Sequence, residues 1–159
     1  MESVYLETSV IGYLASRPSN DVVTAASQLV TRQWWDHHRH EYELFISPAV
    51  VAESNAGDPL AAKERSIFFD GIDMLEITTE AEQLAETLLQ RVPLPAKADV
   101  DALHIAAAAL NGMTFLLTWN CKHIANPALR PIIEHVIRDH NFRPPSICTP
   151  LELIEVDNE

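Results

Sequence analysis

Short apolar runs that alternate with helical patterns along the chain are the feature that most constrains its fold. The apolar runs are residues 3–7, 44–46, 74–77 and 114–118, and, as a last edge strand, the residues around Ile147. The helical patterns between them cover residues 9–15, 21–40, 48–55, 58–69, 79–90, 99–110 and 126–141. Strands separated by helices form parallel sheets that are covered on both faces. The sequence therefore predicts a three-layer α/β/α fold with a parallel sheet of about five strands.

The longest helical pattern, residues 21–40, has an apolar side that we expect to pack on the sheet. This side carries Val23, Ala26, Leu29, Val30, Gln33 and Trp34. The neighbouring tryptophans Trp34 and Trp35 fit either core packing or a contact with a partner protein.

Length and composition indicate one globular domain over residues 1–159. Apolar residues make up 47% of the chain, yet no apolar run approaches the roughly 20 residues needed to span a bilayer. The N-terminus has no basic segment ahead of a hydrophobic one, so we expect no signal peptide. Cys121 and Cys148 do not form a disulfide framework. These features predict a cytoplasmic protein that does not associate with membranes.

The formal net charge of −12 limits how the chain can bind nucleic acid. An acidic protein gains nothing from the general attraction to phosphates, so a bound metal ion, a few local cations or a basic partner must hold a nucleic acid. Only four glycines are present, and no glycine-rich phosphate-binding loop can be identified. The common nucleotide-binding α/β folds are thereby excluded.

Three acidic residues lie where an α/β fold gathers side chains at one edge of its sheet. Glu7 follows the first predicted strand, Glu53 lies in the helix after the second, and Asp101 opens the helix over residues 99–110. Carboxylates that meet in space need a cation between them, and Mg²⁺ or Mn²⁺ takes oxygen ligands. Each acid alone also fits an ordinary solvated position at the end or on the face of a helix. We expect the three to share a metal site.

Other polar side chains flank these acids. Thr8 and Ser9 follow Glu7 and are natural helix caps. Asp99 is expected to cap the helix that Asp101 opens. Thr118 and Asn120 end the fourth strand, where asparagine commonly forms turns and can also orient water or a phosphate group.

Histidines suggest two further interpretations. His104 lies one turn after Asp101 on the same helix face, so it either hydrogen-bonds Asp101 or is a packed core residue. His37, His38 and His40 lie at the end of a predicted helix, where positively charged histidine is favoured, and the run Cys121-Lys122-His123 lacks a second cysteine for a zinc site. A zinc-dependent or thiol hydrolase remains a third hypothesis.

The strings YLETSVIGYL, VVAES, DVDALHIAAAALNG and LLTWNCKHIANP together resemble the PIN domain, and within it the VapC-like toxins of type II toxin–antitoxin systems. The resemblance covers nearly the whole chain. It implies a parallel five-stranded sheet and an acidic pocket that binds Mg²⁺ or Mn²⁺ and cleaves single-stranded RNA. By position, Glu7, Glu53 and Asp101 correspond to three of the family's acids, with Asn120 at the place of a fourth and Thr118 before it.

Two positions depart from the family pattern. Glu7 is one methylene longer than the usual aspartate, and Asn120 lacks the fourth charge. The expected function is a metal-dependent endoribonuclease that forms a homodimer and binds a small antitoxin. The alternative is a catalytically weakened PIN module that binds RNA or a protein partner without cleaving.

Overall fold

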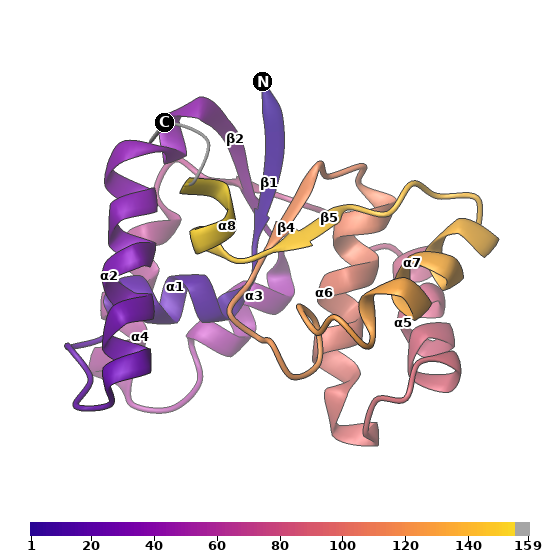
Figure 1. The fold of residues 1–159 in the computed structure, drawn as a ribbon, viewed down its shortest axis with the longest axis horizontal. Coiled ribbons are helices and arrows are strands. Elements are labelled where there is room, and N and C mark those ends of the chain that lie inside the picture. Colours follow the sequence, from indigo (N-terminus) through magenta and orange to yellow (C-terminus); the bar gives the residue numbers. More distant parts are fainter. Residues whose placement is uncertain (155–159) are drawn as a thin grey trace.

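A five-stranded parallel sheet runs through the centre of the computed structural model, which describes residues 1–154 (Figure 1). The strands are β1 (Glu2–Leu6), β2 (Tyr42–Ile46), β3 (Asp73–Met74), β4 (Phe115–Leu117) and β5 (Ser146–Cys148). Their order across the sheet is β3-β2-β1-β4-β5, and every neighbouring pair is parallel. The predicted fold class is therefore confirmed. Residues 155–159 of the predicted domain lie outside the described part.

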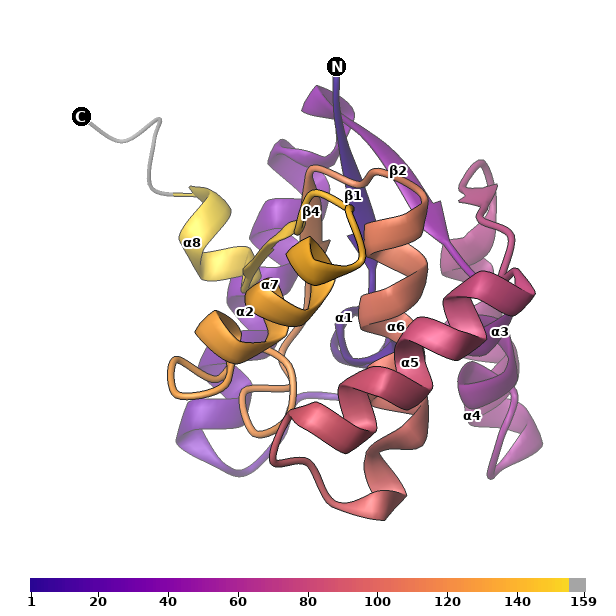
Figure 2. The same ribbon diagram turned by 90° about the vertical axis from the view of Figure 1, so that its right-hand side faces the viewer.

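Helices cover the sheet in two groups (Figures 1 and 2). The helices are α1 (Thr8–Ala15), α2 (Val22–His37), α3 (Pro48–Ser54), α4 (Pro59–Ser66), α5 (Thr79–Arg91), α6 (Asp99–Leu110), α7 (Arg130–Asp139) and α8 (Pro150–Ile154). One group consists of α5, α6 and α7, and the other of α1, α2, α4 and α8, while α3 contacts both α1 and α6. Within residues 1–154, no helix is both long and apolar enough to cross a membrane.

The core forms where the central strand meets α6. Val4, Tyr5 and Leu6 of β1 are all fully buried, as expected of a parallel strand covered on both faces. The alanine run 106–109 of α6 is buried as well, and its small side chains let the helix backbone approach its neighbours closely. Gly112, with φ of +68°, ends this helix in the left-handed conformation that glycine adopts without strain.

Several element boundaries differ from the prediction. The third strand has only two residues instead of residues 74–77, and the helix predicted over 58–69 changes to a 3₁₀ turn at Ile67. The helix predicted from residue 126 begins at Arg130, because Oδ1 of Asn126 accepts a hydrogen bond from the Ala128 amide and holds a turn. The last helix, α8, was not expected.

The side of α2 that faces the core also differs from the prediction. Trp34 is fully buried, which confirms its core position, but Val23 and Leu29 are 74% and 67% exposed. Gln28 and Thr31 are buried in their place. Apolar spacing alone misplaced this face by about one residue position.

Hydrogen bonds explain why polar side chains of α2 point inward. The Gln28 amide group donates to the Arg17 carbonyl and accepts from the Ser19 amide. The Thr31 hydroxyl donates to the Ser27 carbonyl and accepts from the indole N–H of Trp119. Buried polar groups with such partners cost little, so they can displace apolar residues from the interface.

The buried and exposed sides of α2 predict losses of stability of different size for two substitutions. We expect Trp34→Ala to lower the free energy of unfolding by about 3–5 kcal/mol, because it removes a fully buried aromatic side chain. Leu29→Ala, on the exposed side, should change it by less than about 0.5 kcal/mol. Denaturant unfolding measures both. A large loss for Leu29→Ala would mean that the face suggested by the sequence is the buried one.

Candidate active site

The C-terminal ends of the three central strands bring the predicted site residues to one edge of the sheet. Glu7 directly follows β1, and Thr118 directly follows β4, its neighbour in the sheet. The helix before a parallel strand runs back along the sheet, so the first turn of α6, which carries Asp101, lies at this same edge (Figure 1). This arrangement follows the general rule for ligand sites in open α/β sheets.

Glu7 is a buried carboxylate whose two oxygens are both hydrogen-bonded. The residue is 4% exposed and is the N-cap of α1. Its Oε2 accepts the amide N–H of Ser9 at 2.6 Å. Its Oε1 accepts the hydroxyls of Ser9 at 2.9 Å and Thr118 at 2.7 Å. These donors, together with the positive end of the helix dipole, offset the cost of removing the charge from water.

Glu53 projects from α3 and is held through one oxygen. Oε1 accepts the hydroxyl of Thr8 at 2.6 Å and lies 2.5 Å from Nε2 of His104. The glutamate side chain is 38% exposed. Burial raises the pKa of Glu53, but the hydrogen bonds from His104 and Thr8 and the charge of His104 outweigh it. The pKa therefore lies below its ordinary value.

His104 is fully buried and belongs to a chain of polar side chains. Its Nδ1 lies 2.6 Å from the hydroxyl of Tyr5, which is 2.7 Å from the hydroxyl of Ser47. Burial raises the pKa of the Tyr5 phenol, so Tyr5 remains a neutral hydroxyl. The sequence suggested that His104 would hydrogen-bond Asp101 or pack in the core. It is buried, but its carboxylate partner is Glu53.

Asp101 has a histidine partner that the sequence did not suggest. Oδ2 of Asp101 lies 2.9 Å from Nδ1 of His123, in the loop after β4. Oδ1 of Asn120 accepts the backbone N–H of His123 at 3.0 Å, and the backbone N–H of Asn120 donates to the Thr118 hydroxyl. Asn120 thus shapes the loop that carries His123. One feature of the sequence could have indicated this contact: His123 lies three residues after Asn120, in a loop that follows a strand at the same edge of the sheet.

The contacts form two chains that meet in the first turn of α1. One chain runs from Ser47 through Tyr5, His104 and Glu53 to Thr8. The other chain runs from Ser9 through Glu7, Thr118, Asn120 and His123 to Asp101. Thr8 and Ser9 are adjacent residues, so the two chains are joined there. Asp99 is exposed and is the first residue of α6, whose cap is Ala98 rather than Asp99 as predicted.

The donor set can be compared with what a divalent cation needs. Within the described residues, no three His, Cys, Asp or Glu side chains are grouped to hold a metal ion. The shared site of Glu7, Glu53 and Asp101 therefore stays a prediction. Mg²⁺ binds through one or two carboxylates with water in its other positions. Oε2 of Glu53 and Oδ1 of Asp101 accept no hydrogen bond from residues 1–154, so the donor chemistry fits a hydrated cation.

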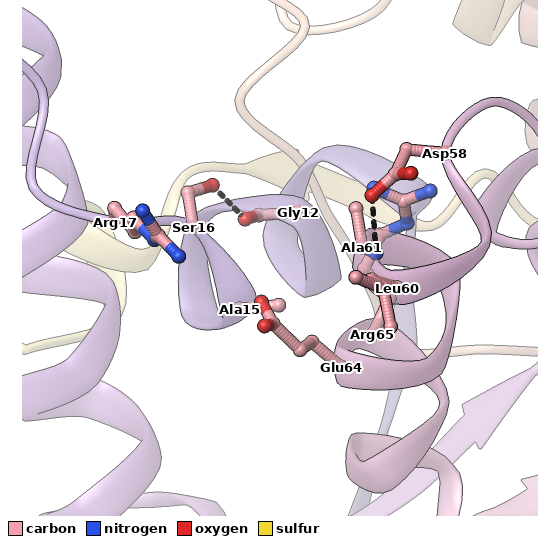
Figure 3. A pocket seen from close by; sticks show the side chains of 9 residues that line it. All are labelled: Gly12, Ala15, Ser16, Arg17, Asp58, Leu60, Ala61, Glu64 and Arg65. Atoms are coloured by element: carbon pink, nitrogen blue, oxygen red, sulfur yellow. Dashed lines mark hydrogen bonds between the residues drawn. The ribbon is translucent and has the colours of Figure 1, made fainter.

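A separate pocket lies at the far end of α1 (Figure 3). It has a volume of about 380 Å³ and lies between the end of α1 and α4. Arg17 and Arg65 enter it from opposite sides, together with Asp58 and Glu64. The guanidinium of Arg65 already donates to two backbone carbonyls, of Ser54 and Ala56. The pocket contains none of the predicted site residues and has mixed charge, so we do not assign the active site to it.

The role of Thr118 in holding Glu7 predicts a loss of stability when its hydroxyl is removed. We expect Thr118→Val to lower the free energy of unfolding by about 1.5–3 kcal/mol, because a buried carboxylate loses a donor. The matched control is Thr149→Val, since the Thr149 side chain makes no hydrogen bond within residues 1–154 and should cost less than about 0.5 kcal/mol. Equal effects in denaturant unfolding would contradict this role.

The lowered pKa of Glu53 predicts a pH dependence. A carboxyl whose folded pKa is depressed contributes stability above its unfolded pKa of about 4.3, and this contribution is lost as pH falls through the folded pKa. We expect wild type to be more stable than Glu53→Gln near neutral pH, with the gap closing below about pH 4. Unfolding free energies measured across this range test the prediction, and a gap that does not change with pH would refute it.

The fold is similar to that of solved structures of other proteins. No family model matches the sequence, and no curated protein matches it. VapC20 of Mycobacterium tuberculosis, a toxin that cleaves the sarcin–ricin loop, is similar with a TM-score of 0.59 and 17% identity, over 76% of this chain and 92% of VapC20. A chain of the Rickettsia felis VapBC2 complex, bound to a DNA fragment from its promoter, is similar with a TM-score of 0.56 and 13% identity. That match covers 92% of this chain and 97% of the other. The chain therefore has the PIN-like α/β/α fold of the VapC toxins.

Proposed function

We propose that this chain is a metal-dependent endoribonuclease that hydrolyses phosphodiester bonds in single-stranded RNA, in the manner of a VapC toxin. The observation that carries the proposal is the hydrogen-bonded network that joins Glu7, Glu53 and Asp101 through the first turn of α1. The fold shared with VapC20, a toxin that cleaves the sarcin–ricin loop, supports the same conclusion. Carboxylates gathered at the carboxyl edge of a parallel sheet suit a metal-assisted hydrolase.

Mg²⁺ or Mn²⁺ is the proposed cofactor. Glu53 and Asp101 would hold it through the oxygens that accept no hydrogen bond from residues 1–154, and Glu7 would add a fixed negative charge at the same edge of the sheet. When bound, the cation supplies Lewis-acid activation of a water molecule and of the scissile phosphate. Thr8 and Ser9 keep the carboxylates of Glu53 and Glu7 oriented while the substrate binds.

During the reaction, protein side chains keep the carboxylates of the site in place. Water attacks the phosphorus in line and loses a proton, the bond from phosphorus to the 3′ oxygen breaks, and that oxygen takes up a proton, leaving 5′-phosphate and 3′-hydroxyl ends. Asn120 holds the loop in which His123 faces Asp101, so this carboxylate keeps one fixed oxygen during the reaction. Thr118 fixes Glu7 in the same way.

Local cations are needed because the chain is acidic overall. Lys97 lies in the 3₁₀ turn before α6, and Lys122 precedes His123; both are exposed at the edge of the sheet that carries the site. We propose that these two lysines contact the RNA backbone, which the formal charge of −12 would otherwise repel.

A second candidate function is a PIN module that binds RNA or a protein without cleaving. The observation that favours it is Glu7, whose two oxygens already accept hydrogen bonds from Ser9 and Thr118, which leaves fewer lone pairs for a cation. The two candidate functions share a fold and differ only in whether the protein cleaves the RNA that it binds.

The proposed partners follow from charge and fold. A small basic antitoxin would complement an acidic toxin, and the VapBC2 complex supports this type of pairing. We also propose a homodimer and a cytoplasmic location, which suits the free thiols of Cys121 and Cys148.

Cleavage assays separate the two candidates. Wild type with Mn²⁺ is expected to cut single-stranded RNA, and Asp101→Ala should lower the rate by about 100-fold or more, because a predicted cation ligand is lost. The control is Glu64→Ala, an exposed acid of α4 outside the site, which should cleave like wild type. Binding of RNA without cleavage at any Mn²⁺ concentration would instead identify the non-cleaving module.

A further inference from the structure

His104 uses both ring nitrogens although it is 0% exposed. Its Nε2 is 2.5 Å from Oε1 of Glu53, and its Nδ1 is 2.6 Å from the hydroxyl of Tyr5. That hydroxyl is 2.7 Å from Oγ of Ser47, which is also 0% exposed. Any buried imidazole needs polar partners for its nitrogens, so the informative point is which partners these are: a carboxylate on one side and a buried hydroxyl on the other. The ring therefore links the buried hydroxyl of Tyr5 to the carboxylate of Glu53.

The chemistry of the partners fixes the direction of the contact with Glu53. An ionised carboxylate only accepts hydrogen bonds, so Nε2 of His104 must carry the proton. When the ring is neutral, Nδ1 accepts from the hydroxyl of Tyr5, and that hydroxyl accepts from Ser47. When the ring is charged, the Tyr5 hydroxyl accepts from Nδ1 and donates to Ser47. His104 therefore donates to Glu53 in either state.

This donation matters because, within residues 1–154, it and the Thr8 hydroxyl are the only hydrogen bonds that hold the Glu53 side chain. A glutamate side chain that is 38% exposed on a helix samples several rotamers unless something holds it. Oε1 of Glu53 receives one donor from α6 and one from the first turn of α1, through His104 and Thr8. Fixing Oε1 with two donors also fixes the direction of Oε2, which accepts no hydrogen bond from the part of the chain that the structure describes.

We propose that His104 is a positioning residue for the catalytic site: anchored on Tyr5 and Ser47 in the core, it holds Glu53 so that Oε2 points to the reacting groups. The proposal deepens the nuclease function and rests on it. It differs from a purely structural role, because it requires the Nε2 donor in particular rather than any side chain that fills the space.

Two substitutions of similar size distinguish these roles. The side-chain nitrogen of glutamine reaches about as far as Nε2, whereas that of asparagine stops near Nδ1. His104→Gln should therefore keep the donor to Glu53, and His104→Asn should keep only the contact with Tyr5. Circular dichroism and thermal unfolding on both variants establish that they are folded before comparison.

The first measurement is independent of catalysis. Three-bond NMR couplings of the Glu53 side chain should report a single rotamer in wild type and in His104→Gln, and averaged rotamers in His104→Asn. Long-range ¹⁵N–¹H spectra of the imidazole should show the proton on Nε2 in wild type. A bare Nε2, or a Glu53 rotamer that stays fixed in His104→Asn, would overturn the proposal.

The second measurement is the kinetics of RNA cleavage. His104→Asn should lower kcat by about 10- to 100-fold with KM changed less than twofold, and His104→Gln should recover most of the loss. Equal losses in both variants would show a role in packing instead. If wild type cleaves no RNA, the proposed function fails, and the Glu53 rotamers alone decide whether His104 positions this carboxylate.

Discussion

The buried carboxylate of Glu7 is the interaction on which the arrangement of this edge depends. An ionised group that is 4% exposed requires hydrogen bonds in place of water, and it obtains them from Ser9 and Thr118. These donors come from two elements that follow neighbouring strands. The first turn of α1 and the loop after β4 must therefore both be in place for Glu7 to be satisfied. Folding of the scaffold and assembly of the candidate site are in this way the same event.

Two of the three acids are each in contact with a histidine. Glu53 is paired with His104 and Asp101 with His123, and each pair leaves one carboxylate oxygen without a donor from residues 1–154. Each pair keeps its carboxylate in one orientation. Such preorganisation lowers the cost of bringing negative charge together when a cation or a phosphate group binds.

Most of the fold, but only part of the site, was predictable from the sequence. Alternating strands and helices determine a parallel sheet, and the sheet determines which edge carries Glu7, Glu53 and Asp101. The partner of Asp101 was not predictable, because His123 is held against it by the loop that Asn120 shapes. The buried face of α2 was misplaced for a related reason. Gln28 and Thr31 are buried through hydrogen bonds to distant residues, which the spacing of apolar residues does not record.

The shortness of the outer strands has a consequence for assembly. The sheet ends in β3, with two residues, on one side and β5, with three residues, on the other. Strands this short expose few unpaired backbone groups, so they offer little template for a further strand from another polypeptide. Growth of the sheet from chain to chain is thereby disfavoured. A protein that binds this molecule must recognise side chains on its helices and loops rather than extend its sheet.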